Sequence, residues 1–287
     1  MAAALPRFDD QAAWGAYAPA AWVRALLAAC HAVPGRVPAL HRLVIWLRRP
    51  VKYGVAHPLD VMQWGLKLRL LPRGNMSDAK LLFAPQFFDR AELALLAERL
   101  PPGGTFVDVG ANAGIYSFWA HHCMRGRGRI LAVEPDPEMR RRLRFNLDSN
   151  GLSNVELAPV ALSDRQGTAA LLLNLSQRGE NTLALEEASA AGGDRMALTV
   201  ETDTLTHLLQ AHGMARIDAL KIDIEGHEPP VLRHFYAHAP EALWPRLVIV
   251  EFKQQTSEAI TALFEGCGYR RLLATRLNWA FERDPSR

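Results

Sequence analysis

Cysteine and long apolar runs are both scarce in this sequence of 287 residues. It contains three widely separated cysteines: Cys30, Cys123 and Cys267. None has the spacing of a zinc site or a disulfide framework, which favours a reducing compartment. The longest apolar run, residues 20–33, contains two interruptions and is too short to span a bilayer. With no signal-peptide pattern in residues 1–10, we expect a cytoplasmic protein, in possible contact with the inner membrane face.

The net charge of the chain is also small, but the charged residues are distributed unevenly along the sequence. The formal net charge is only +3, which is weak evidence for a nucleic-acid partner. Residues 1–75 nevertheless carry a net charge of +7, and the remainder carries −4. A hydrophobic content of 49% with a mean hydropathy of −0.05 excludes a disordered chain and a polytopic membrane protein.

The charge step separates two expected parts, a basic helical extension over residues 1–62 and the main domain over residues 63–287. Apolar residues recur at helical spacing over residues 22–30 and 40–47, which predicts two short helices. Two interpretations of their basic face remain open. It is either the solvated face of a helical lid, or it contacts an anionic membrane surface or an acidic acceptor.

Strands alternate with helical patterns through the rest of the chain. The predicted strands of this region cover residues 105–109, 129–134, 155–162, 219–224 and 247–252. Such alternation predicts an α/β fold, with a mostly parallel sheet covered by helices on both faces. A further strand is expected at residues 65–71, two more at 169–173 and 197–201, and a closing hairpin at 269–282. The arginines of residues 140–144 are expected on a solvated helix face.

Polar residues follow the predicted strands, at the edge where parallel sheets bind ligands. The first turn has glycines at Gly110 and Gly114 but lacks the middle glycine of a dinucleotide site. Asp108 would repel a phosphate and suits an ammonium group, and Glu134 can accept hydrogen bonds from two ribose hydroxyls. A ribose joined to a cationic amino acid, without phosphate, describes S-adenosylmethionine.

Four segments together resemble the FkbM family of S-adenosylmethionine-dependent methyltransferases: residues 106–117, 133–136, 161–164 and 220–228. The likeness covers about residues 65–252. It implies a Rossmann-like class I methyltransferase fold, with a seven-stranded sheet whose last strand is antiparallel. It also implies methyl transfer to a hydroxyl of a sugar or a polyketide-like secondary metabolite by in-line displacement.

The resemblance also implies a set of cofactor-binding residues. They are Asp108, Gly110, Asn112, Gly114 and Tyr116 in the first turn, Glu134 and Pro135 at the ribose, Ser163 and Asp164 at the adenine, and Asp223. The loop of residues 174–185, with Asn181 and Thr182, is similar to the acceptor-side loop of the family.

An alcohol acceptor benefits from a positioned general base. The candidates at the ends of the fourth and fifth strands are Asp223, Glu225, His227 and Glu251. His227 titrates nearest to neutral pH, although it could instead be a structural residue at a helix start. The three carboxylates could bind a divalent metal, but we expect catalysis without one. Lys221, in a strand interior, is as consistent with a structural ion pair as with a catalytic role.

Four other functions compete with O-methylation of a small molecule. An N- or carboxyl-directed small-molecule methyltransferase has the same cofactor site, and an NAD-dependent oxidoreductase uses the same kind of sheet. A nucleic-acid methyltransferase is disfavoured because residues 228–231 lack the Asn/Asp-Pro-Pro-aromatic motif and the main domain is acidic. A non-catalytic protein that binds S-adenosylmethionine is the fourth possibility.

Overall fold

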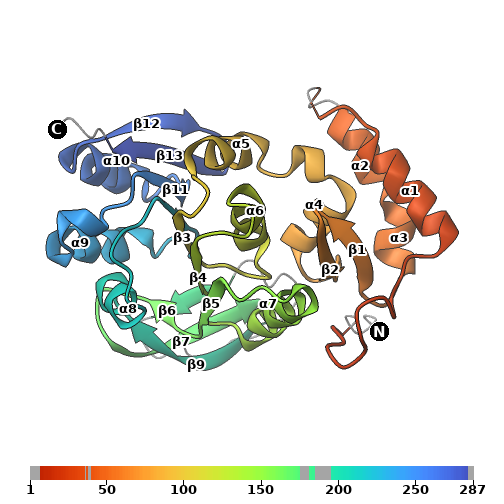
Figure 1. Ribbon diagram of the computed structural model, residues 1–287, viewed down its shortest axis with the longest axis horizontal. Helices are drawn as coiled ribbons and strands as arrows, with labels where there is room; N and C mark the ends of the chain where they lie inside the picture. The colour runs from red at the N-terminus through yellow and green to blue at the C-terminus, as the bar shows by residue number, and fades with distance from the viewer. Residues whose placement is uncertain (1–6, 36, 38–39, 175–180, 185–194, 284–287) are drawn as a thin grey trace.

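The computed structural model describes residues 7–35, 37, 40–174, 181–184 and 195–283. Within them, the main sheet has seven strands in the order β12-β13-β11-β10-β3-β4-β5 (Figure 1). In chain order they are β3 (Thr105–Val109), β4 (Arg129–Val133), β5 (Val155–Ala158), β10 (Ala219–Ile222), β11 (Leu247–Glu251), β12 (Tyr269–Ala274) and β13 (Asn278–Arg283). The strands from β11 to β5 are parallel, and β13 runs antiparallel to β11. The predicted class I methyltransferase sheet is confirmed.

Helices cover both faces of this sheet, because its central strands are apolar on both sides. One face packs on α5 (Arg90–Arg99), α6 (Ile115–Cys123) and α7 (Pro137–Asn150). The other packs on α8 (Leu205–Ala211), α9 (Glu228–His238) and α10 (Ser257–Gly266). Neighbouring residues of one strand alternate between the two cores: Phe106 faces the first and Val107 the second.

Helix α7 illustrates how local sequence fixes an element that positions the site. Asp136 caps its start by accepting a hydrogen bond from the backbone N–H of Glu138, and Pro137 supplies the preset φ of the first turn. Gly151 ends the helix with a φ of 61°, in the left-handed region that favours glycine. The helix expected to carry the arginines of residues 140–144 is therefore present, from Pro137 to Asn150.

One predicted strand, over residues 155–162, is wrong as a single element. It divides into β5 of the main sheet and β6 (Ala161–Leu162) of a smaller four-stranded sheet in the order β6-β9-β7-β8. The break falls at Pro159, which has no N–H to donate to a neighbouring strand. The other strands of the small sheet are β7 (Gly167–Asn174), β8 (Thr182–Ala184) and β9 (Arg195–Asp203).

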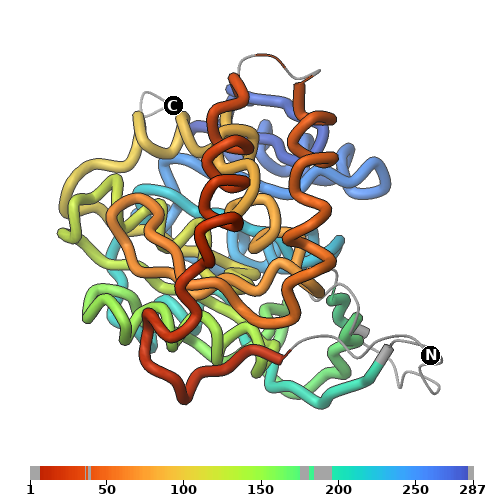
Figure 2. Tube along the Cα trace, turned by 90° about the vertical axis from the view of Figure 1, so that its right-hand side faces the viewer, coloured from red at the N-terminus to blue at the C-terminus, as the bar shows by residue number. Residues whose placement is uncertain are grey.

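The N-terminal part forms an outer layer beyond α6 and α7, as Figures 1 and 2 show. Its helices are α1 (Ala21–His31), α2 (His41–Leu47), α3 (Arg49–Gly54) and α4 (Met76–Phe83). Between α3 and α4 lies an antiparallel hairpin of β1 (Leu59–Gln63) and β2 (Leu66–Leu70). The two helices expected here are confirmed, whereas α3, β1 and α4 had no expected counterpart. The expected domain boundary at residue 62 falls inside β1.

A buried ion pair ties the start of the chain to this hairpin. Arg69 of β2 donates two hydrogen bonds to the carboxylate of Asp60 of β1, at 2.7 and 2.8 Å, and both side chains are almost fully buried. The remaining guanidinium N–H groups donate to the backbone carbonyls of Asp9, Ala12 and Ala13. The buried charge is therefore fully paired, as burial requires.

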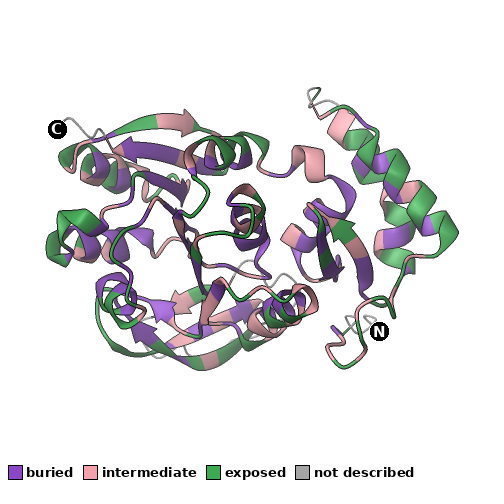
Figure 3. Ribbon diagram, viewed as in Figure 1, coloured by how far each residue is buried: buried purple, intermediate pink, exposed green. Residues whose placement is uncertain are grey.

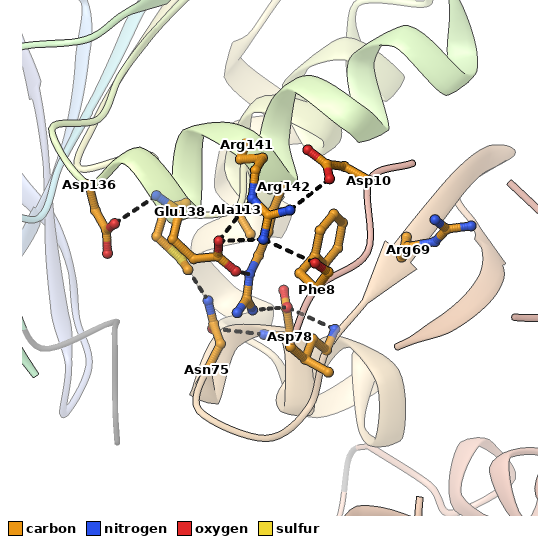
Figure 4. A network of polar contacts seen from close by, with 12 residues as sticks. Phe8, Asp10, Arg69, Asn75, Asp78, Ala113, Asp136, Glu138, Arg141 and Arg142 are labelled. Carbon is orange, nitrogen blue, oxygen red and sulfur yellow. Dashed lines mark hydrogen bonds and ion pairs between the residues drawn. The ribbon is translucent and has the colours of Figure 1, made fainter. Parts of the chain in front are cut away.

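Two arginines of α7 belong to a second anchor of the N-terminal part (Figure 4). Arg142 is 4% exposed and forms ion pairs with Asp78 of α4 and Glu138 of α7. Arg141 forms ion pairs with Glu138 and with Asp10 near the start of the chain. The expected solvated face is therefore wrong at Arg142, because α4 and the N-terminal segment cover this side of α7.

Candidate functional site

Two adjoining pockets lie at the carboxyl ends of the parallel strands. The β4 pocket is lined by the ends of β3 and β4 and by the small sheet: Val109, Val133, Glu134, Pro135, Val160, Ala161, Leu162, Leu171, Asn181, Leu183, Ile224 and His227. The β11 pocket includes Met76, Ser77, Lys80, Phe88, Asp89, Asp108, Tyr116, Lys221, Glu251 and Asn278. Gly110, Asn112, Asp223 and Glu225 line both. The two pockets therefore form one continuous groove at the expected edge of the sheet.

The first turn owes its glycines to contacts within the protein. Gly110 has a φ of +72°, and a β-carbon there would lie 1.9 Å from the carbonyl oxygen of Asp223. Gly114 has a φ of +89°, and its β-carbon would lie 2.3 Å from a methyl carbon of Leu143. Close approach of neighbouring chain segments, rather than of a ligand, requires glycine at both positions.

Asn112 connects this turn to the end of β4 and to the N-terminal part. Its backbone N–H donates to the carboxylate of Glu134 at 2.7 Å. Its side-chain oxygen accepts a hydrogen bond from Asn75 at 2.6 Å. Asn75 also caps α4 by accepting from the backbone N–H groups of Ser77 and Asp78. Asn75 was not among the expected site residues, because its contact with Asn112 spans 37 residues.

Glu134 offers the hydrogen-bond acceptors that a ribose diol needs. Its carboxylate is buried, and each oxygen accepts one backbone N–H, from Asn112 and from Asp136. A carboxylate oxygen has a second acceptor site, so both oxygens retain capacity for a hydroxyl donor. Burial raises the pKa of Glu134 to about 7, and hydroxyl donors would favour its charged form. Glu134 therefore fits the ribose of S-adenosylmethionine.

Asp108 lies at the inner end of the groove beside Lys221, its register neighbour on β10. It is 1% exposed, and its carboxylate accepts a hydrogen bond from the hydroxyl of Ser117 at 2.6 Å. Burial raises the pKa of Asp108 to about 6, despite the opposing effects of Ser117 and Lys221. The ammonium group in the methionine part of S-adenosylmethionine would compensate for the buried negative charge. Asp108 therefore fits this group of the cofactor.

Lys221 is held by contacts on two sides. Its ammonium lies 2.9 Å from the carboxylate of Asp223 and 5.1 Å from the ring centre of Tyr116. The hydroxyl of Tyr116 donates to Asp89 at 3.0 Å. Burial opposes the charge of Lys221, but Asp223 and the neighbouring Asp108 outweigh it, so its pKa is raised. Lys221 is therefore charged and forms the ion pair that the sequence left open.

Three carboxylates gather at the ends of β10 and β11. One oxygen each of Asp223, Glu225 and Glu251 lies within 4.8 Å of the others. Lys253 balances part of their charge, with its ammonium 2.5 Å from Glu225 and 3.4 Å from Glu251. Burial, reinforced by Asp223 and Glu225, raises the pKa of Glu251 to about 8. Its Oε2 is buried and accepts no hydrogen bond from the described part of the chain, and the Lys253 ammonium at 3.4 Å is its ion-pair partner.

The remaining expected site residues lie around the β4 pocket. His227 lines it, 3.4 Å from the hydroxyl of the buried Ser163, and burial lowers the pKa of this histidine. Asp164 is exposed, and neither it nor Ser163 is among the lining residues, which include their neighbour Leu162.

The expected acceptor-side loop also reaches this pocket. Asn181 lines it and donates to Asp136 at 3.0 Å, close to the Glu134 end of β4. Thr182 is exposed and does not line either pocket. Residues 175–180 and 185 of this loop lie outside the described residues.

Comparisons with known proteins identify the family of this chain. The model of the FkbM methyltransferase domain matches residues 108–271. The methyltransferase sdnD of Sordaria araneosa is 30% identical over 210 residues, which cover 63% of this chain and 79% of that protein. The 31-O-demethyl-FK506 methyltransferase FkbM of Streptomyces tacrolimicus is 29% identical over 68% of this chain and 83% of its own length.

Solved structures include a methyltransferase FkbM from Methylobacillus flagellatus, 15% identical with a TM-score of 0.42. The matched segment covers 72% of this chain and 54% of that one. The match to the FkbM methyltransferase domain spans more than half of this chain. The chain therefore belongs to the FkbM methyltransferase family, and S-adenosylmethionine is its cofactor.

Proposed function

We propose that this methyltransferase modifies a hydroxyl group of a small molecule, such as a sugar or a polyketide-like metabolite. The observation that carries the proposal is Glu251, a half-buried carboxylate with a pKa raised to about 8, in the β11 pocket. An alcohol loses its proton reluctantly, and a general base is most effective when its pKa lies near the working pH. Glu251 meets this condition.

Different residues of the groove would hold different parts of the cofactor and the acceptor. When bound, S-adenosylmethionine supplies an electrophilic sulfonium methyl group. Glu134 would hold the ribose, Asp108 the ammonium group, and the apolar lining around Leu162 and Leu183 the adenine. The acceptor would then occupy the β11 pocket, where Glu251 takes the hydroxyl proton. Holding both reactants in one groove lowers the entropic cost of the reaction.

His227 is the second candidate for the base, and its position supports a different role. It lines the β4 pocket with Glu134, whereas Glu251 lines the β11 pocket. Burial lowers the pKa of His227, so it is largely neutral at pH 7. We therefore propose that His227 borders the nucleoside, and that Glu251, flanked by Asp223 and Glu225, faces the acceptor.

The name of one relative supports oxygen as the acceptor atom: the Streptomyces tacrolimicus protein is a 31-O-demethyl-FK506 methyltransferase. An amine or carboxylate acceptor is the alternative, and it would have less need of Glu251. A nucleic-acid substrate is disfavoured by the acidic balance of residues 76–287, which carry a net charge of −4.

The acceptor class is tested by supplying labelled S-adenosylmethionine with mixtures of sugars, hydroxylated polyketides, amines and carboxylic acids. We expect label in a methyl ether, identified by mass spectrometry and carbon-13 chemical shift. A methylamine or methyl ester as the only product would contradict O-methylation. Transfer to RNA alone would contradict the small-molecule acceptor.

A control in the same assay addresses the metal alternative. Lys221 and Lys253 already balance charge in the carboxylate cluster, so the proposed reaction has no need of a divalent cation. Turnover is expected to be unchanged after exhaustive chelation. Strict dependence on added Mg²⁺ would instead assign Asp223, Glu225 and Glu251 to a metal.

A further inference from the structure

The outer face of α2 and α3 presents aromatic and basic side chains in one stripe. Arg42, Trp46, Arg49 and Tyr53 are all exposed, at successive spacings of four, three and four residues. Residues at these spacings lie on one side of a helix. Trp46 is 67% exposed and Tyr53 is 64% exposed, which is high for large aromatic residues.

This stripe is not needed for packing within the chain. Arg48, between the two helices, keeps helical backbone angles, and the N–H of Lys52 donates to its carbonyl. Val44, Val51 and Val55 are buried on the opposite side of this nearly continuous helix. The packing face is therefore already apolar. Outside it, the ring of Tyr53 contacts the Lys52 ammonium at 5.9 Å, and no ring or cation contact of Trp46 is found in the described chain.

Helix α1 lies beside α2 and α3 and widens the exposed face, as Figure 2 shows. Figure 3 shows the outward sides of these helices as exposed. Trp22 of α1 and Leu43 of α2 are also exposed, at 53% and 46%. We call the stripe on α2 and α3 the aromatic–arginine face: Arg42, Trp46, Arg49 and Tyr53.

The charge of this surface has one sign. Residues 11–59 contain six lysines and arginines and no aspartate or glutamate. The arginines of the face therefore have no carboxylate from their own segment, in contrast to Arg69 and Arg142, which are paired inside the protein. A partner that fits the face must be anionic and must also accept apolar side chains.

We propose that the aromatic–arginine face docks the protein on an anionic phospholipid surface. Tryptophan and tyrosine favour the level of the lipid headgroups, and lysine and arginine are attracted to anionic lipids by about 1 kcal/mol each. Docking is peripheral, since no helix in the described chain is long and apolar enough to cross a membrane. The purely positive charge favours lipid over a second copy of the same face, which would repel it.

The docked helices are joined to the wall of the β11 pocket. His31 of α1 contacts the carbonyl of Leu82 in α4 at 2.9 Å, and Gln86 donates to the carbonyls of Cys30 and Val33. Helix α4 in turn supplies Met76, Ser77 and Lys80 to that pocket. Docking would thus hold the pocket close to the lipid surface. The proposal does not depend on the chemical class of the acceptor.

Vesicle flotation of the full chain tests the proposal. The protein is expected to float with vesicles of phosphatidylcholine and phosphatidylglycerol and to stay behind with phosphatidylcholine alone. Arg42→Gln with Arg49→Gln should weaken binding about 30-fold, the product of two charge contacts of about 1 kcal/mol. The double variant Trp46→Ala with Tyr53→Ala should abolish flotation.

A charge-matched pair gives the control: Arg125→Gln with Arg233→Gln removes two exposed arginines outside the face and should change binding less than twofold. Unchanged adenosylmethionine binding in every variant shows that the fold is intact. Absence of flotation by the wild-type protein would overturn the proposal. So would a stable dimer in solution that Trp46→Ala dissociates, because the occupant would then be a second copy.

Discussion

Glu251→Gln should lower kcat by about 10²–10⁴-fold, the usual contribution of a general base. The substitution keeps the size of the side chain and removes its capacity to take a proton. It also removes a carboxylate whose charged form the site disfavours, so we expect a folded protein with ordinary cofactor affinity. Single-turnover rates with a fixed hydroxyl acceptor measure the effect.

The dependence of kcat on pH is a second test of Glu251 as the base. Burial and the neighbouring carboxylates Asp223 and Glu225 raise the pKa of Glu251 to about 8, and Lys253 opposes them. A base acts when deprotonated, so wild-type kcat should rise with pH to a plateau above 8, and the variant should lose this step. Glu265→Gln, at an exposed position of α10, is the control. A kcat within tenfold of wild type in Glu251→Gln, with a large loss in His227→Gln, would assign the base to the histidine.

Arg69→Met should lower the free energy of unfolding by about 3–5 kcal/mol, the cost of breaking a buried ion pair. The substitution leaves Asp60 buried without its cation and removes donors from three backbone carbonyls. Burial alone would raise the pKa of Asp60, but hydrogen bonds from Arg69, Tyr17 and Gly15 lower it overall. This contribution to stability is therefore present at neutral pH and is lost as the pH falls through the acid range.

Urea unfolding of Arg216→Met is the matched control for Arg69→Met. Arg216 pairs with Asp218 at 3.4 Å and is 62% exposed, so its loss should cost less than about 1 kcal/mol. Equal costs for the two variants would show that the Arg69 pair does not anchor the N-terminal part. A larger cost confined to Arg69→Met, reduced at acid pH, is the expected result.

The main sheet could be predicted because its signals are local. Apolar strands such as residues 105–109 and 219–222 are bounded by turns, and caps such as Asp136 mark the helices. The break in the predicted strand over residues 155–162 also had a local signal, because Pro159 lies within that segment. The strands of the main sheet and the helices between them were therefore accessible from the sequence alone.

The anchoring of the N-terminal part could not be predicted, because it depends on contacts between distant residues. Arg69 reaches the carbonyl of Asp9, 60 residues earlier, and Arg142 reaches Asp78, 64 residues away. Neither side chain differs locally from a solvated arginine. The basic extension is consequently joined to the same hydrophobic core as the sheet, through residues such as Val44 and Val51.

In the candidate site, the residues could be named from the sequence, but their roles could not be ranked. Its carboxylates follow predictable strand ends, so Asp108, Glu134 and Glu251 could be named as candidates. Their ranking depends on burial and neighbours, which raise the pKa of Glu251 and lower that of His227. Lys253, which contacts two of the carboxylates, had no motif to identify it.

Isothermal titration with S-adenosylmethionine tests the cofactor site most directly. The account predicts one site per chain in the wild type, and at least about tenfold weaker binding in Asp108→Ala and in Glu134→Ala, because each removes a charge-assisted hydrogen bond. Glu265→Gln should bind as the wild type does. Wild-type affinity in both Asp108→Ala and Glu134→Ala would show that neither carboxylate holds the cofactor.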